Sequence, residues 1–220
     1  MIIFMFSENE AKLEERKFYE NGQPEEQVFY RNGKLEGEYR LWHENGQLEV
    51  QTFFLDGKEE GEHRWWYADG QLREQAFFRN GKLEGECKLW YENGKLKEQE
   101  FYRDGKLGGE RKLWYINGQL KKQEFYRDGK LEGDCKSWYE NGQLEEQGFY
   151  QNGKSEGEYK YWRGNGKLWE YEFYQNGELI DLYFNRTKKK AFLRLGRYLR
   201  NRVDLFTSIM IVDLAKIVCA

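Results

Sequence analysis

The chain has 220 residues, a net charge of −3 and a mean hydropathy of −1.03, yet 18% of its residues are aromatic. Disordered segments are poor in aromatic residues, so this composition excludes a disordered chain although 34% of the residues are charged. A single proline and 24 glycines argue against a linker. A thin, repetitive architecture fits these values better than a deep globular core, so internal repeats are the first feature to look for.

The charge is unevenly distributed along the chain. Residues 186–220 hold nine Lys/Arg and two Asp/Glu, whereas the residues before them hold 27 Lys/Arg and 37 Asp/Glu. Phosphate binding requires a clustered basic face on the folded domain. The acidic body therefore predicts no nucleic-acid partner, and only the basic tail suits an anionic surface.

Cysteine usage and the chain ends predict a reducing, cytoplasmic setting. Cys87, Cys135 and Cys219 are odd in number and lack CxxC spacing, which gives neither a disulfide framework nor a zinc site. The apolar run at residues 1–6 is too short for a signal-peptide core and has no basic residue before it. In the tail, charged residues such as Asp204 interrupt any apolar stretch of membrane-spanning length.

Asn-Gly and Asp-Gly dipeptides recur in two interleaved series, each with a period of 24 residues. The first series is Asn21-Gly22, Asn45-Gly46, Asp69-Gly70, Asn93-Gly94, Asn117-Gly118, Asn141-Gly142 and Asn165-Gly166. The second is Asn32-Gly33, Asp56-Gly57, Asn80-Gly81, Asp104-Gly105, Asp128-Gly129, Asn152-Gly153 and Asn176-Gly177. Such dipeptides favour primed hairpin turns, in which both central residues have positive φ. The segments between them are strand-length and too short for stable helices. The repeats therefore predict one antiparallel sheet of about 14 strands.

Pairing across a two-residue turn predicts the register and hence the two faces. Around Asn93-Gly94, one face pairs Tyr91 with Leu96, Leu89 with Glu98, Cys87 with Glu100 and Gly85 with Tyr102. The other face pairs Trp90 with Lys97, Lys88 with Gln99 and Glu86 with Phe101. The period is even, so the same assignment holds in every repeat.

Two aromatic stripes lie on the second of these faces, with successive members about 10 Å apart. The first is Trp42, Trp66, Trp90, Trp114, Trp138 and Trp162. The second is Phe53, Phe77, Phe101, Phe125, Phe149 and Phe173. One interpretation is packing that stabilises a sheet without a second layer. The other is an accessible binding surface, because a single-layer sheet leaves a face open. We expect both to apply, and predict that the stripes are the partner-binding residues.

Glycines also recur within the strands, inside the text Leu-Glu-Gly-Glu. They are Gly37, Gly61, Gly85, Gly109, Gly133 and Gly157. A glycine within a strand marks either a bulge or a place where an aromatic ring covers the backbone. Tyr102 lies opposite Gly85 in the predicted register, which favours the second interpretation.

The recurrent text Phe-Tyr-Arg-Asp-Gly-Lys-Leu-Glu-Gly-Glu-x-Lys-Leu-Trp-Tyr-Glu-Asn-Gly-Gln-Leu resembles the MORN repeat, in the bacterial variant form of the YwqK-like antitoxin family. The resemblance covers residues 12–177, and the Tyr-x-x-Gly-x-x-x-Gly core is matched, for example, at Tyr102, Gly105 and Gly109. It implies a repeat sheet with a lipid-associated, scaffolding or antitoxin role. The family motif contains no catalytic residue, so none is carried over.

Residues for catalysis or metal binding do not stand out. His43 and His63 occupy slots that Tyr or Cys hold in other repeats, so we interpret them as substituted surface positions. No phosphate-binding loop, nucleophile elbow or metal-ligand spacing is present in the sequence. We therefore predict a protein that is not an enzyme and has no cofactor and no metal.

The last segment changes pattern, with apolar residues every three or four positions between basic ones, which predicts an amphipathic helix over residues 186–220. Three interpretations are open: a cap on the end of the sheet, a helix on an anionic membrane surface, or a docking helix for another protein. For the membrane interpretation, the predicted contacts are Lys188, Lys189, Lys190, Arg194 and Arg197.

Taken together, the sequence predicts an all-β, elongated, single-layer antiparallel β-meander with a C-terminal α-helical tail. The predicted segments are an N-terminal cap at residues 1–11, the repeat array at 12–185 and the basic helix at 186–220. The predicted function is a scaffold for protein–protein interaction, with antitoxin-like binding of a partner as its narrower form. A peripheral membrane module anchored by the tail is the alternative.

Overall fold

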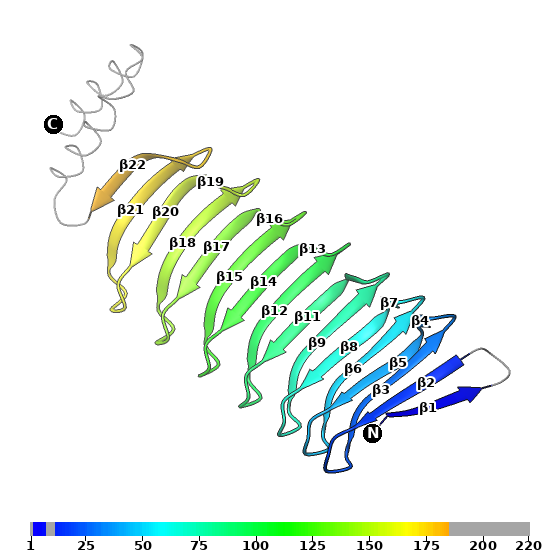
Figure 1. Cartoon of the computed structure of the whole chain (residues 1–220). Helices are drawn as coiled ribbons and strands as arrows, with labels where there is room; N and C mark the ends of the chain where they lie inside the picture. The colour runs from blue at the N-terminus through cyan, green and yellow to red at the C-terminus, as the bar shows by residue number, and fades with distance from the viewer. Residues whose placement is uncertain (1, 8–11, 185–220) are drawn as a thin grey trace, which may run out of the picture.

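The computed structural model describes residues 2–7 and 12–184, which form a single open antiparallel sheet of 22 strands. The strands follow one another in chain order along an elongated array (Figure 1). Within the described residues no second layer covers either face of the sheet, and there is no helix. The all-β meander is therefore as predicted.

The strands have the following bounds: β1 Ile2–Ser7, β2 Lys12–Phe18, β3 Pro24–Arg31, β4 Lys34–Leu35, β5 Gly37–Trp42, β6 Leu48–Leu55, β7 Lys58–Glu59, β8 Gly61–Trp66, β9 Leu72–Arg79, β10 Lys82–Leu83, β11 Gly85–Trp90, β12 Leu96–Arg103, β13 Lys106–Leu107, β14 Gly109–Trp114, β15 Leu120–Arg127, β16 Lys130–Leu131, β17 Gly133–Trp138, β18 Leu144–Gln151, β19 Lys154–Ser155, β20 Gly157–Trp162, β21 Leu168–Gln175 and β22 Glu178–Phe184.

The prediction of about 14 strands is wrong, because each return segment of a repeat is broken into two strands. Between β10 and β11, Glu84 donates its backbone N–H to the carbonyl of Phe77 at 2.8 Å, and Gly85 has a φ of +82°. Residues 84–87 bulge opposite only two residues of β9, since Leu83 pairs with Phe78 and Lys88 with Gln75. Residues 2–7 add one more strand at the N-terminal end. The predicted helical tail lies outside the described residues.

The two turn series differ, although their dipeptides are alike. In the second series both central residues have positive φ, as in Asn80 (52°) and Gly81 (74°), which is the predicted primed turn. In the first series only the glycine does, for example Gly94. There the Asn93 side chain accepts the Lys95 backbone N–H at 3.1 Å, which favours a type I turn closed by a glycine bulge.

This bulge shifts part of the predicted register. The pairs from Gly85–Tyr102 to Leu89–Glu98 are confirmed, but Trp90 pairs with Leu96 instead of Lys97. Tyr91 instead donates its backbone N–H to the Lys95 carbonyl. The prediction was wrong here because it assumed that every Asn-Gly turn has two residues.

The sheet has two unlike faces. We call the face of Glu86, Lys88, Trp90, Leu96, Gln99, Phe101 and their equivalents the aromatic face. We call the face of Cys87, Leu89, Glu98, Glu100, Tyr102 and their equivalents the buried face. The most buried side chains all lie on the latter, in rows that run across the strands: Val28, Val50, Thr52, Ala76, Cys87, Glu100, Glu124, Cys135 and Tyr159. The strands bend along their length (Figure 1). We infer that side chains on the inner side of this bend converge and cover one another, which gives a single layer its core.

Candidate functional site

The aromatic face carries both predicted stripes, but they differ in exposure. All six tryptophans of the first stripe are half-buried. Five phenylalanines of the second stripe rank among the exposed large apolar residues: Phe53, Phe77, Phe101, Phe125 and Phe149, at 36–45%. Phe173 is half-buried. Sequence reasoning placed the two stripes on one face but could not tell which of them is accessible. In the structure, the phenylalanine stripe is the more exposed of the two.

Between the stripes runs a strip of paired charges. The Lys88 ammonium lies 2.5 Å from the Glu86 carboxylate, which also accepts the Gln99 side-chain amide. The hydrogen bond from Lys88 is the main cause that lowers the pKa of Glu86. The same acid, amide and base recur at Glu38, Gln51 and Arg40, at Glu62, Gln75 and Arg64, and at Glu110, Gln123 and Lys112. This strip is therefore close to neutral and repeats with little change.

A ladder of hydrogen bonds from side chains to backbone carbonyls connects consecutive repeats at one edge of the sheet. The Tyr67 hydroxyl donates to the Trp90 carbonyl at 2.8 Å, and the Tyr91 hydroxyl to the Trp114 carbonyl at the same distance. His43 takes the tyrosine's place with its Nε2 3.0 Å from the Trp66 carbonyl. The aromatic face thus rests on a frame whose spacing is fixed by repeated hydrogen bonds.

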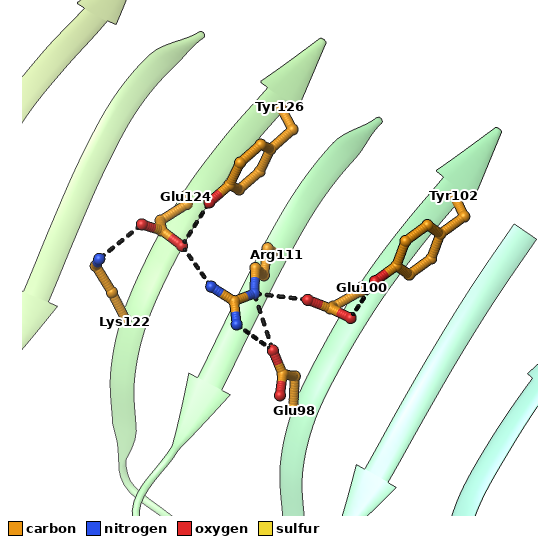
Figure 2. A network of polar contacts seen from close by, with 7 residues as sticks. All are labelled: Glu98, Glu100, Tyr102, Arg111, Lys122, Glu124 and Tyr126. Atoms are coloured by element: carbon orange, nitrogen blue, oxygen red, sulfur yellow. Dashed lines mark hydrogen bonds and ion pairs between the residues drawn. The ribbon is translucent and has the colours of Figure 1, made fainter. Parts of the chain in front are cut away.

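On the buried face, one cluster of charges interrupts the repeat (Figure 2). Arg111 contacts three carboxylates: Nε lies 2.7 Å from Glu100, Nη1 lies 3.1 Å from Glu124, and Nη2 binds Glu98. The cluster is completed by Lys122, 2.7 Å from Glu124, and by the hydroxyls of Tyr102 and Tyr126, which donate to Glu100 and Glu124. A buried charge must be paired to be tolerated, and Arg111 supplies that pairing.

The cluster shifts the carboxyl pKa values in opposite directions. Burial raises the pKa of Glu98, and its contact with Arg111 only partly offsets this. Burial also opposes ionisation of Glu124, but Lys122 and Arg111 outweigh it and lower the pKa of Glu124. Beyond the cluster, burial raises the pKa of Glu146, with Lys122 opposing. The arrangement is one of satisfied charges on packed strands, and we interpret it as structural.

Sequence reasoning missed this cluster. It placed His63 on the surface. The structure places His63 on the buried face, with its side chain 16% exposed and its Nδ1 3.3 Å from Glu59. The predicted register already put Glu100 opposite Cys87, on the face without the stripes. A single arginine in the slot of Cys87 and Cys135 was the signal that could have found it.

The two described cysteines occupy that slot as small buried residues. Burial raises the pKa of Cys87 to about 12 and that of Cys135 to about 11. Both therefore stay neutral thiols near pH 7 and are poor nucleophiles. Among the described residues, no group of three or more His, Cys, Asp or Glu is placed to hold a metal ion.

The predicted membrane contacts Lys188, Lys189, Lys190, Arg194 and Arg197 lie outside the described residues. Over residues 2–7 and 12–184, no helix is long and apolar enough to cross a membrane.

Comparison with known proteins gives one family. The MORN repeat variant matches six consecutive units, at residues 13–32, 35–56, 59–80, 83–104, 107–128 and 131–152. These units cover more than half of the chain. No curated protein matches it. The narrower assignment to the YwqK-like antitoxins gains no support from these comparisons.

Proposed function

Because the chain belongs to the MORN repeat variant family, we propose that it is a non-catalytic repeat scaffold that binds another protein through the aromatic face. The observation that carries the proposal is the row of exposed phenylalanines on a face that no other described residue covers. Exposed apolar patches of this kind mark interaction sites, and aromatic residues are enriched in them.

The frame of the sheet also supports this proposal. Successive phenylalanines lie two strands apart, about 10 Å, and the ladder of tyrosine and carbonyl groups fixes that spacing. Rigid presentation lowers the entropic cost of binding. The neutral charge strip beside the row adds hydrogen-bonding groups without a large desolvation cost.

Photo-crosslinking tests the proposal directly. Benzoylphenylalanine placed at Phe101 on the aromatic face is expected to capture a partner in cell extract, and the same probe at Tyr102 on the buried face is not. The double variant Phe77→Ser plus Phe125→Ser is expected to reduce capture at position 101 at least five-fold. Equal capture from both faces, or capture indifferent to the serines, would count against the aromatic face.

Two narrower roles rest on the sequence alone. A toxin-like partner is the specific form of this proposal that the family resemblance implies. Peripheral membrane association through the basic residues of the 186–220 segment is the alternative. Co-sedimentation with anionic liposomes that persists unchanged after deletion of residues 186–220 would remove the membrane alternative. Cytoplasmic localisation and a bacterial source likewise stay predictions.

A further inference from the structure

The phenylalanine row divides into two kinds of repeat, according to whether a Cβ added at the glycine that follows would contact the phenylalanine side chain. At Gly37, Gly109 and Gly133, with φ of 98–105°, an added Cβ would lie 3.5–3.8 Å from the preceding phenylalanine side chain. At Gly61, Gly85 and Gly157, with φ of 71–82°, it would meet nothing within 4 Å. We call the first kind closed and the second kind open.

The acid before the glycine follows the same division in four of the six repeats. Of the other two, the closed repeat of Gly109 has Gly108 in place of the acid, and the open repeat of Gly85 has Arg79 at the arginine position without an ion pair to Glu84. In closed repeats, Oε1 of Glu36 lies 3.9 Å from Arg31 and Oε1 of Glu132 lies 3.7 Å from Arg127. In two open repeats, Glu60 and Glu156, the position of that arginine is held by Leu55 or Gln151. Across the described part of the chain, Glu60 and Glu156 have no ion-pair partner.

One oxygen of each of these two carboxylates is already used inside the sheet. Oε2 of Glu60 accepts the Asn80 backbone N–H at 2.7 Å, and Oε2 of Glu156 accepts that of Asn176 at 2.7 Å. The other oxygen, Oε1, is the one that contacts an arginine in Glu36 and Glu132, and in Glu60 and Glu156 it has no such partner within the described residues. The two carboxylates are therefore held in place with one oxygen available.

A hollow lies beside each of these acids on the aromatic face. The first has a volume of about 520 Å³ and is lined by Phe53, Glu60, Gly61, Glu38, Glu62, Arg64, Gln51 and Thr52. The second, of about 280 Å³, has the equivalent lining: Phe149, Glu156, Gly157, Asp134, Glu158, Lys160, Gln147 and Gly148. Each thus combines an exposed ring and bare glycine backbone with one unpaired carboxylate. The other two carboxylates are ion-paired, with Arg40 and Arg64 in the first hollow and with Lys136 and Lys160 in the second.

We propose that these two hollows are subsites for a cationic side chain, arginine or lysine, of the partner protein. The aliphatic stem would pack on the exposed phenylalanine ring, with the charge near Oε1 of Glu60 or Glu156 in the place that Arg31 and Arg127 occupy in closed repeats. The acidic charge of residues 1–185 favours the approach of such a basic segment.

The spacing of the hollows adds a constraint on the partner. Phe53 and Phe149 are four repeats, or eight strand spacings, apart, which is about 38 Å along the sheet. A partner that fills both subsites therefore presents two cations at about that separation. This inference rests on the proposed function, since it names the chemistry that the aromatic face would recognise.

The test uses N-acetyl-arginine amide and its neutral isostere N-acetyl-citrulline amide as probes. Their titration into the full chain, followed by NMR at the backbone amides of Gly61 and Gly157, is expected to show saturable shifts for arginine. Citrulline is expected to bind at least five-fold more weakly. Gly109 and Gly133, in closed repeats, are expected to shift little with either probe.

Variants separate the two hollows. Glu60→Gln keeps the acceptor for Asn80 and is expected to abolish arginine binding at Gly61 while leaving Gly157 unchanged. Leu55→Arg introduces the arginine that pairs with Glu36 and Glu132 in closed repeats, and it is expected to weaken arginine binding at Gly61 by competing for Oε1. Glu132→Gln, in a closed repeat, is the matched control and is expected to change neither site.

Three results would overturn the inference: equal binding of citrulline, equal shifts at closed and open repeats, or insensitivity to Glu60→Gln. The photo-crosslink at Phe101 lies in a closed repeat and does not depend on the hollows. Crosslinking without arginine binding would reject the cationic subsites and keep the scaffold. Arginine binding without crosslinking would keep the cationic subsites and reject the proposed scaffold function.

Discussion

The aromatic face and the buried face are made by the same strands, yet they differ in how regularly their residues repeat. On the aromatic face, contacts such as that of Glu86 with Lys88 and Gln99 recur from repeat to repeat. On the buried face, one slot is filled in turn by Tyr39, His63, Cys87, Arg111, Cys135 and Tyr159. The comparison indicates that the repeated residues build the frame. On the buried face, by contrast, each repeat fills the same slot with a different residue, which packs against its own set of neighbours.

Arg111→Met is expected to cause the largest loss, because it leaves three carboxylates on the buried face without their shared cation. Removing one partner of a buried ion pair costs about 3–5 kcal/mol. Since the Arg111 side chain is 26% exposed, we expect a smaller loss of about 2–4 kcal/mol in urea unfolding.

Lys88→Met is the matched change on the aromatic face, where the pair is more exposed, and it is expected to cost less than about 1 kcal/mol. Equal losses for the two variants would mean that the faces do not differ in the way their charges are supported.

Gly148→Ala is expected to be next in size, by overpacking a slot on the buried face. An added Cβ would overlap the ring of Tyr159, which is 2% exposed and has little room to move. Overpacking of this kind costs about 1–3 kcal/mol.

The double variant Gly148→Ala plus Tyr159→Cys recreates the Ala76–Cys87 arrangement of another repeat. We expect it to be clearly less destabilised than the sum of its single variants, measured as a double-mutant cycle. Strict additivity would show that the glycine and the tyrosine are not coupled.

Two glutamates of the buried face are expected to have opposite pH dependence. The pKa of Glu124 is lowered, so its contribution to stability is present at neutral pH and is lost as the pH falls through that pKa. Glu124→Gln should therefore destabilise the protein at pH 7, by about 1–2 kcal/mol, and less at low pH.

The pKa of Glu146 is raised, so its contribution is full below its unfolded value and is lost as the pH rises through the folded value. Glu146→Gln is expected to stabilise the protein at pH 7 relative to acid. Unfolding curves at pH 4 and pH 7 for both variants check the signs, and the same sign for both would contradict the assignment.

The features that the sequence predicts are those set by local contacts. Asn-Gly and Asp-Gly turns act over a few residues, so the meander and the pairs from Gly85–Tyr102 to Leu89–Glu98 were predictable. The slip at Trp90 was not, because it depends on the choice between two turn types that the same dipeptide allows.

The accessibility of the site was harder to predict than its location. The shared face of Trp90 and Phe101 follows from period and parity, but the exposure of the phenylalanines depends on how the sheet bends. The favoured interpretation of the glycines was wrong at Gly85, which lies in a bulge. Where an aromatic side chain lies beside such a glycine, as at Gly109, it is that of Phe101 and not a tyrosine. Which repeats are open and which are closed could not be predicted from the sequence, because it depends on where Arg31 and its equivalents lie relative to the acids.

The regular frame has gaps, and filling one is expected to stabilise the protein modestly. Gly108 stands where other repeats have a glutamate, such as Glu84, whose carboxylate accepts the Asp104 backbone N–H at 2.9 Å. A Cβ at Gly108 would meet only the Lys106 carbonyl, at 4.0 Å, so a side chain fits.

Gly108→Glu is expected to raise the free energy of unfolding by about 1 kcal/mol, through a new bond to the Asp128 backbone N–H and a less flexible unfolded chain. Gly108→Ala supplies only the second effect and is the control. If the two variants are equally stable, the carboxylate does not form the bond that it forms elsewhere in the frame.

The smallest expected effect concerns a single missing donor at the edge of the frame. Asn45 and Asn93 each donate a side-chain N–H to a carbonyl of the next repeat, at 2.7 Å and 3.2 Å. Asp69 occupies the same position and accepts the Gln71 backbone N–H at 2.9 Å, but a carboxylate has no N–H to donate. Asp69→Asn is therefore expected to stabilise the protein by about 0.5 kcal/mol, and Asn93→Asp to destabilise it by a similar amount in the same urea titration. Changes of the same sign would contradict the missing-bond explanation, and so would a difference that disappears at about 1 M salt, where charge effects are screened.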